Sequence, residues 1–218
     1  MAINSEFGWR GVIEGNDLTG KTTQVDMLAD WIRDEYGRQV LVINEPDGPT
    51  EMPQRLRDII KDGTIARSPK TNVLLFTGAR VESFAYAEDF MNQGGIVLAA
   101  RDKDSTDAYQ GAGEGVPFEY IDQISKLSLP PRYFKPELKV YLSLEHMKRQ
   151  ARMAGREVTE KPDTFEMRAV DFQDRVNGFY FDNSVKENIP LINADQPRAA
   201  INMEIRELIW LRGLLPRR

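Results

Sequence analysis

The chain has 218 residues, 41% of them hydrophobic, which suits a single domain over residues 1–218 with a sizeable core. Zero cysteines and a single histidine, His146, exclude a disulfide framework, a thiolate metal site and a multi-histidine metal site. The net charge of −5 argues against a nucleic-acid polymer as partner, because phosphate neutralisation dominates that kind of affinity. The apolar runs are far shorter than the ~20 residues of a membrane span, and MAINSEFGWRG lacks the pattern of a secretory signal. We therefore expect a cytoplasmic protein with no membrane partner.

Five short apolar segments are predicted to be strands, and segments of helical periodicity separate them. Most of the strands are continuous runs of Val, Ile and Leu, as expected when both faces of a sheet are covered. They are residues 11–14, 40–44, 96–100, 138–144 and 190–194. The predicted helices are residues 25–36, 69–90, 118–127, 163–188 and 198–214. This alternation predicts an α/β fold, a five-stranded parallel sheet flanked by helices, with ligands at the carboxyl ends of the strands.

A phosphate-binding motif, GNDLTGKT, follows the first predicted strand and opens the first predicted helix. Its glycines let backbone N–H groups close around phosphate oxygens, and the helix N-terminus adds positive potential. Lys21 is expected to reach the β- and γ-phosphates, and the Thr22 hydroxyl to bind Mg²⁺. The pattern predicts a P-loop NTPase type of fold that binds ATP or a similar polyphosphate. The expected ATP-binding residues are Gly15, Asn16, Leu18, Thr19, Gly20, Lys21, Thr22 and Thr23.

Three further stretches of sequence indicate a site for a second substrate. NEPDGPTEMPQRLRDII follows the second strand, LLFTGARVES lies in the helix predicted over residues 69–90, and RDKDSTDAYQG follows the third strand. Together with EGNDLTGKTT, they resemble the thymidylate kinase family in order and spacing, over nearly the whole chain. The resemblance implies a five-stranded parallel sheet, a small flexible lid, and Mg²⁺-dependent transfer of the γ-phosphoryl group of ATP to dTMP. It also implies a homodimer, with residues 112–129 or 73–90 as the candidate interface helix.

The resemblance also implies roles for individual residues around the acceptor nucleotide. Asp17 and Glu45 match acids near the acceptor sugar, and Glu45 also lies near the metal in the family. Arg101 matches an arginine that binds the acceptor monophosphate, and Tyr109 a ring whose bulk disfavours a ribose 2′-hydroxyl. The full expected acceptor site is Asp17, Glu45, Phe76, Arg80, Arg101, Ser105, Thr106, Tyr109 and Gln110.

Phe76 and Arg80 make physical sense as a base pocket without the resemblance. They are four residues apart and share one helix face. A pyrimidine needs an aromatic partner, and such stacking contributes about 1–3 kcal/mol per base. The alternatives are a core position for Phe76, a solvated helix charge for Arg80 and ordinary packing for Tyr109.

A basic segment after the fourth strand predicts the lid, at about residues 147–166. Lys148, Arg149, Arg152 and Arg156 recur at three- and four-residue spacing, so they largely share a helix face. Positioned arginines stabilise the charge of phosphoryl transfer, although a solvated basic helix has the same pattern. Some thymidylate kinases carry an arginine directly after the P-loop acid, where this chain has Leu18. The expected catalytic residues are therefore Lys21 and Asp17 with Arg149, Arg152 and Arg156 of the lid, and Asp163 and Glu166 resemble lid-closing acids.

Two positions depart from the family pattern. Ala100 stands where members have an aspartate before the arginine of the third strand, and Asn44 stands where they have an arginine before Glu-Pro. The hypothesis for the metal is that Asp102 or Glu45, together with Thr22, takes over its positioning.

The leading prediction is a Mg²⁺- and ATP-dependent kinase that converts dTMP to dTDP. One rival keeps the reaction with dUMP or a 5-modified deoxyuridylate as acceptor. Others are a nucleotide-binding protein that has lost turnover and a P-loop hydrolase with a protein partner.

Overall fold

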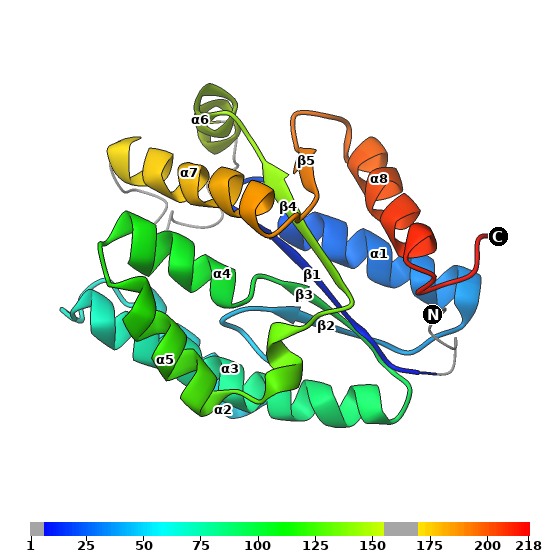
Figure 1. Cartoon of the computed structure of the whole chain (residues 1–218), viewed down its shortest axis with the longest axis horizontal. Helices are drawn as coiled ribbons and strands as arrows, with labels where there is room; N and C mark the ends of the chain where they lie inside the picture. The colour runs from blue at the N-terminus through cyan, green and yellow to red at the C-terminus, as the bar shows by residue number, and fades with distance from the viewer. Residues whose placement is uncertain (1–6, 155–169) are drawn as a thin grey trace.

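The computed structural model describes residues 7–154 and 170–218, and it contains one five-stranded parallel sheet (Figure 1). The strands are β1 (Arg10–Gly15), β2 (Val40–Asn44), β3 (Ile96–Ala100), β4 (Leu138–Ser143) and β5 (Leu191–Asn193), in the order β2-β3-β1-β4-β5. The predicted fold class is confirmed. Every predicted strand is present, because the runs of Val, Ile and Leu are buried on both faces of the sheet.

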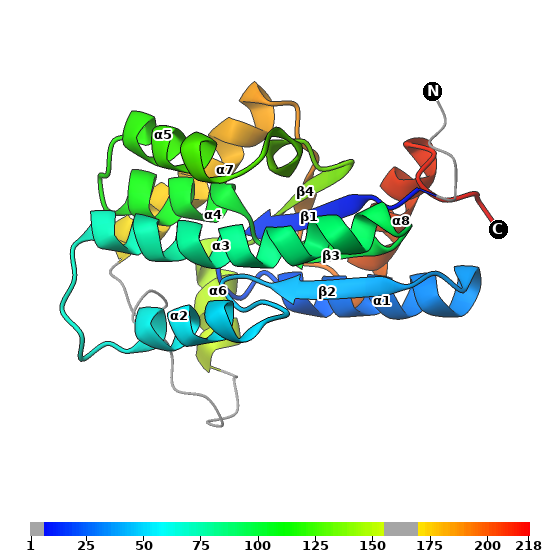
Figure 2. The same cartoon turned by 90° about the horizontal axis from the view of Figure 1, so that it is seen from below.

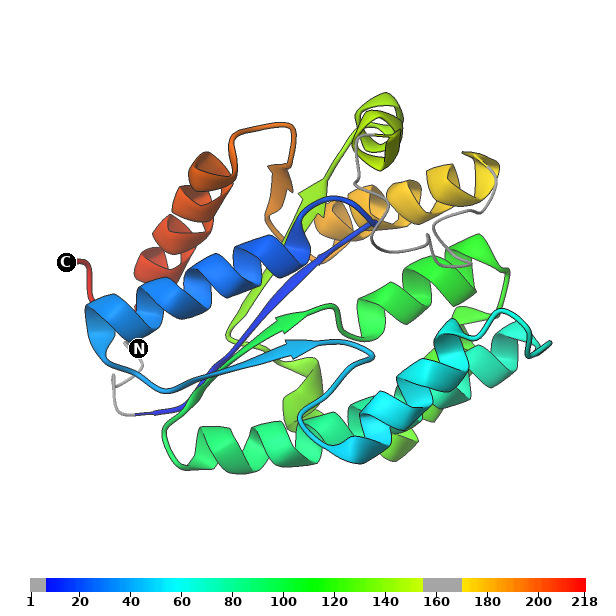
Figure 3. The same cartoon turned by 180° about the vertical axis from the view of Figure 1, so that it is seen from behind.

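Helices cover both faces of the sheet. On one face, α1 (Lys21–Tyr36) and α8 (Arg198–Leu211) pack on a core that includes Leu28, Ile205 and Leu98 (Figure 3). On the other face, α3 (Pro69–Asn92) buries Phe84 and Met91 against β1, β2 and β3. Shorter elements complete this side: α5 (Phe118–Ser128) and the 3₁₀ turn Pro131–Phe134. Within the described ranges, no helix is long and apolar enough to cross a membrane.

The remaining helices surround the carboxyl ends of the strands. They are α2 (Glu51–Lys61), which lies along the first part of α3 (Figure 2), and α4 (Lys103–Thr106) with the π-helix Asp107–Gly113 that continues it. The other two are α6 (His146–Ala154) and α7 (Val170–Lys186), which flank residues 155–169. The helix predicted over residues 163–188 begins outside the described residues, and its described part is α7.

The prediction of one continuous helix over residues 112–129 is wrong. The π-helix ends at Gly113, Gly115 turns the chain at φ 78°, and α5 begins only at Phe118. The residue before a proline avoids helical dihedrals, so Pro117 also prevents Val116 from continuing a helix. The shorter prediction, residues 118–127, agrees with α5.

Candidate active site

The phosphate loop joins β1 to α1 through backbone conformations that constrain its sequence. Gly15 has φ 139°, and a Cβ there would collide with the carbonyl oxygen of Leu142 on β4. Gly20 and Leu18 also have positive φ, at 90° and 67°. The ammonium group of Lys21 donates to the backbone oxygen of Asn16 at 2.7 Å, so its side chain folds back over the loop. The loop and Lys21 therefore lie together at the N-terminus of α1, where a polyphosphate site is expected.

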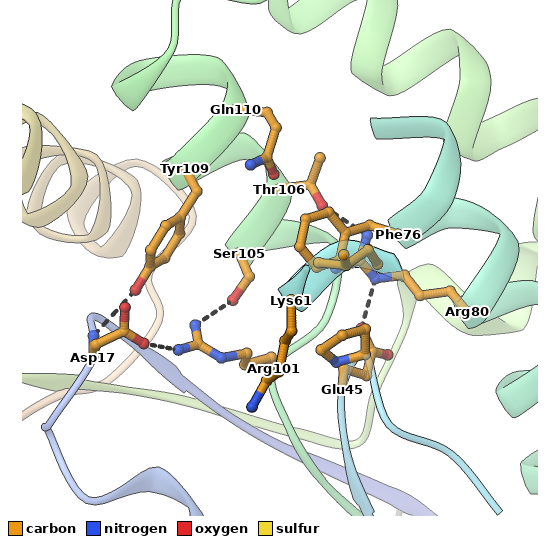
Figure 4. A pocket seen from close by; sticks show the side chains of 12 residues that line it. Asp17, Glu45, Lys61, Phe76, Arg80, Arg101, Ser105, Thr106, Tyr109 and Gln110 are labelled. Carbon is orange, nitrogen blue, oxygen red and sulfur yellow. Dashed lines mark hydrogen bonds and ion pairs between the residues drawn. The ribbon is translucent and has the colours of Figure 1, made fainter. Parts of the chain in front are cut away.

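A pocket of about 590 Å³ opens beside this loop, and all nine residues of the expected acceptor site line it (Figure 4). They come from the phosphate loop, the end of β2, α3, the end of β3, α4 and the π-helix. An aromatic ring, two arginines and two carboxylates in one lining are the polar and apolar groups of a small-molecule site. Its lining also contains Pro46, Ile60 and Lys61, which sequence reasoning did not single out.

Arg80 connects three parts of the pocket wall. Its guanidinium donates to the Glu45 carboxylate at 2.6 Å, to the Thr106 hydroxyl at 2.7 Å and to the backbone oxygen of Asp102 at 2.7 Å. The Arg80 and Glu45 side chains are 3% and 8% exposed, so this ion pair is buried. The Phe76 ring lies 5.8 Å from the guanidinium, on the same helix. An aromatic face and a fixed cation therefore form one wall, and Arg80 is not a solvated helix charge.

Arg101 lies at the turn between β3 and α4 with φ 78°, a conformation that side chains rarely adopt. Its guanidinium pairs with the Asp17 carboxylate of the phosphate loop, and it donates to the Ser105 hydroxyl at 3.0 Å (Figure 4). Burial would raise the pKa of Asp17, but the charges of Arg101 and Lys21 outweigh burial and hold this pKa below its usual value. The turn at Arg101 thus joins the phosphate loop directly to the pocket lined by Phe76 and Arg80.

Glu14, the residue before the phosphate loop, holds these segments together from below. Its carboxylate accepts hydrogen bonds from the N–H groups of Gly15, Asp102 and Ser105 at 3.1, 2.7 and 2.9 Å. It also accepts from the hydroxyls of Ser105 and Tyr180 at 2.9 and 2.8 Å. Burial raises its pKa from 4.5 to about 7, and the charge of Asp102 adds to the rise.

The structure does not bring the Asp102 carboxylate into the pocket. That group caps α4 through the N–H of Asp104 at 2.9 Å, and it pairs with Lys139 at 2.7 Å and Arg10 at 3.5 Å. Ala100 is buried in the core on the α1 side of the sheet. Of the two acids considered for metal positioning, only Glu45 lines the pocket.

Of the arginines of α6, Arg152 reaches the phosphate loop. The guanidinium of Arg152 donates to the backbone oxygens of Leu18 at 2.9 Å and Ala194 at 2.6 Å. Arg149 is 4% exposed, and its Nε and Nη1 groups have no hydrogen-bond partner among the described residues. Lys148 pairs with Asp195 at 3.2 Å. Three predicted lid residues, Arg156, Asp163 and Glu166, lie outside the described residues.

Comparison with known proteins identifies the family. Residues 13–205 match the sequence profile of thymidylate kinase. The chain belongs to the thymidylate kinase family. A thymidylate kinase of Chromobacterium violaceum is 31% identical, with 94% of each chain covered, and one of Paracidovorax citrulli is 29% identical, with 95% of each covered.

Solved structures show the same fold. A thymidylate kinase from Ehrlichia chaffeensis superposes with a TM-score of 0.74 and 23% identity, covering 93% of this chain and 98% of that one. A thymidylate kinase from Candida albicans gives a TM-score of 0.73 and 21% identity, covering 95% and 93%. The profile match over residues 13–205 and the relative that is 31% identical confirm the prediction of family membership, and with it that of a nucleoside monophosphate kinase type of enzyme.

The sequence carried weak signals for two residues, Ile60 and Glu14, that sequence analysis did not single out. Residues 51–61 carry apolar side chains at helical spacing, and the pattern places Ile60 inward, where it is 3% exposed. Glu14 is the one acid in β1 and follows the apolar residues Val12 and Ile13, and such a buried charge requires partners.

Proposed function

We propose that the protein transfers the γ-phosphoryl group of ATP to dTMP, giving dTDP and ADP. The observation that carries this proposal is the direct junction of two sites. Asp17 belongs to the phosphate loop, and its carboxylate pairs with Arg101 in the lining of the second pocket. An acceptor in that pocket would therefore lie beside the phosphates of the donor, as direct transfer requires.

At the donor site, the N–H groups of the phosphate loop and Lys21 would hold the phosphates of ATP. The residues present fit Mg²⁺, a cation that prefers oxygen ligands and keeps several waters. Thr22 has an exposed hydroxyl in the first turn of α1, and Glu45 lines the adjacent pocket. The described residues contain no group of three or more acidic or histidine side chains suited to a metal, so phosphate oxygens and water would supply most ligands. Bound Mg²⁺ would neutralise charge on the phosphates.

At the acceptor site, Phe76 would stack on the pyrimidine, and Arg80 is held beside the same space by Glu45 and Thr106. Arg101 would bind the acceptor monophosphate. Thr106 and Gln110 would contact the base or sugar, with Ser105 holding Arg101 through its hydroxyl. No general base is needed, because the attacking group is already an anionic phosphate.

For the transition state, the contacts of the two described lid arginines differ. Arg152 is already bound to the backbone of Leu18 and therefore ties α6 to the phosphate loop. Arg149 has two buried N–H groups without a described partner, and buried donors of this kind require an acceptor. We therefore favour Arg149 as the cation that stabilises the transferring phosphoryl group, with Arg152 positioning the lid. Arg156 remains a further candidate.

A coupled ADP-release assay with dTMP, dUMP, dCMP, UMP and AMP in parallel tests the proposal. The expected result is the highest kcat/KM with dTMP, and the dUMP arm measures the alternative acceptor. ADP release that none of the five nucleotides accelerates would overturn the kinase function. Arg149→Met is expected to lower kcat by about a thousandfold while Lys148→Met leaves it near the wild-type value.

We further infer a cytoplasmic homodimer. The chain has no cysteine, and α3 exposes Leu74 and Tyr86, which are 50% and 47% exposed and suit a contact with a second copy. Light scattering during size-exclusion chromatography would give the mass of a dimer, and a monomeric mass at micromolar concentration would contradict this inference.

A further inference from the structure

The side chain of Asn16, the second residue of the phosphate loop, is directed toward Tyr109 and α7. It is 1% exposed, and its hydrogen-bonding groups already have protein partners. Its Oδ1 accepts from the Tyr109 hydroxyl at 3.0 Å and from the N–H of Asp17 at 2.7 Å. Its Nδ2 donates to Oδ1 of Asn177 on α7 at 2.8 Å. The Asn177 contact orients the amide so that its oxygen faces Tyr109.

Tyr109 in turn is held at both ends of its side chain. Its hydroxyl accepts a hydrogen bond from the N–H of Asp17 at 3.1 Å while donating to Asn16 (Figure 4). The Arg101 guanidinium lies 5.3 Å from the ring, and Phe172 packs edge-on at 6.1 Å. Burial, followed by the charge of Asp17, raises the pKa of Tyr109 well above its usual value. The hydroxyl therefore stays protonated, and both Oδ1 of Asn16 and the Asp17 carboxylate are acceptors for its proton.

We propose that Asn16 is a specificity-determining residue, which fixes the Tyr109 ring so that the acceptor site rejects ribonucleotides. This inference rests on the proposed function and on the role expected for Tyr109, which lines the acceptor pocket and whose bulk would disfavour a ribose 2′-hydroxyl. The Tyr109 ring can exclude a ribose 2′-hydroxyl only if the ring is held in place. A hydroxyl group is small, so a slight displacement of the ring would make room for it. Asn16 supplies this restraint from the phosphate loop, with Asn177 as its support.

If this restraint operates, the hydroxyl of Tyr109 contributes to selectivity for deoxyribonucleotides over ribonucleotides, although the ring provides the bulk. The variants are Tyr109→Phe, which keeps the ring, Asn16→Leu, which keeps the side-chain volume, and the two combined. The measured quantity is the ratio of kcat/KM with dTMP to kcat/KM with UMP. We expect each single variant to lower this ratio by about tenfold and the combination to lower it no further, because both remove one shared restraint.

A matched control is Asn202→Leu. Asn202 is also 1% exposed and hydrogen-bonded, but it contacts Gln24 and Arg206 on the α1 and α8 side of the sheet. Its ratio is expected to equal that of the wild type. This control separates the specific contact with Tyr109 from the general cost of a buried leucine in place of asparagine.

The outcomes separate this inference from the proposed function. A wild-type enzyme that prefers dTMP while Tyr109→Phe retains the full ratio would overturn the inference and leave the kinase function intact. An Asn16→Leu variant that loses activity equally with dTMP and UMP would also overturn it, since the role would then be structural only. Absence of dTMP-dependent ADP release from the wild type would refute the proposed function itself.

Discussion

Replacing Arg80 with methionine is expected to destabilise the fold as well as the acceptor pocket. The substitution keeps much of the side-chain length but removes the guanidinium and its three hydrogen bonds. It leaves the carboxylate of Glu45, which is 8% exposed, without its cation. Burial already raises the pKa of Glu45 against the opposing effect of Arg80, so this pKa will rise further in the variant.

The size of the effect follows from this burial. Removing one partner of a buried ion pair costs about 3–5 kcal/mol, against a total stability of about 5–15 kcal/mol. With a denaturant slope of about 3 kcal/mol per M, the urea midpoint would fall by roughly 1–2 M. Equilibrium unfolding in urea, followed by circular dichroism, measures this shift.

Two further variants make the test decisive. Arg55→Met removes an exposed pair with Glu51 on α2, whose side chains are 72% and 77% exposed, and should not move the midpoint measurably. Adding Glu45→Gln to Arg80→Met should cost less than the sum of the single changes, since no charge is then left buried. An Arg80→Met midpoint equal to that of Arg55→Met would refute the reasoning.

Three other predictions concern the same segments. Lys61→Gln should raise the KM for dTMP roughly fivefold and leave that for ATP unchanged in steady-state kinetics, because Lys61 lines the acceptor pocket and lies outside the phosphate loop. Gly15→Ala should abolish ATP binding in calorimetry, whereas Gly178→Ala, which has open space, should not. Glu14 binds its proton more tightly in the folded state, so its contribution to stability is complete below about pH 4.5 and lost as pH rises through about 7. Glu14→Gln should therefore flatten the fall in unfolding free energy across that range, and an unchanged slope would contradict the raised pKa.

Sequence patterns predicted the sheet well because each strand is a short run of apolar residues with a clear end. The helical periodicity of α3 and its Ser68-Pro69 start were equally legible, and Ser68 does cap that helix. The structure of the region after β3 could not be predicted in this way. A turn at Arg101, a four-residue helix and a π-helix follow one another there, so the hydrophobic residues show no single periodicity. Gly115 and Pro117 were the signals that residues 112–129 could not form one helix.

The pocket lining was predictable because short motifs place these residues at the ends of strands and on one helix face. The part played by Glu14 was not, because its partners Asp102, Ser105 and Tyr180 lie 88 to 166 residues away. The position of the Asp102 carboxylate was unpredictable for the same reason. Its direction depends on Arg10 and Lys139, which come from β1 and β4 on the far side of the turn.

The charged groups of the acceptor pocket occur as opposite partners, Glu45 with Arg80 and Asp17 with Arg101. Neither member can be exchanged alone without leaving an uncompensated charge, so mutation must alter both at once or pass through a weakened intermediate. The two residues of each pair should therefore be substituted together during evolution. Lys61 on α2 has no such ion-pair partner among the described residues. It is therefore the pocket cation that can be substituted most easily, and changes in acceptor preference would arise most easily at this position.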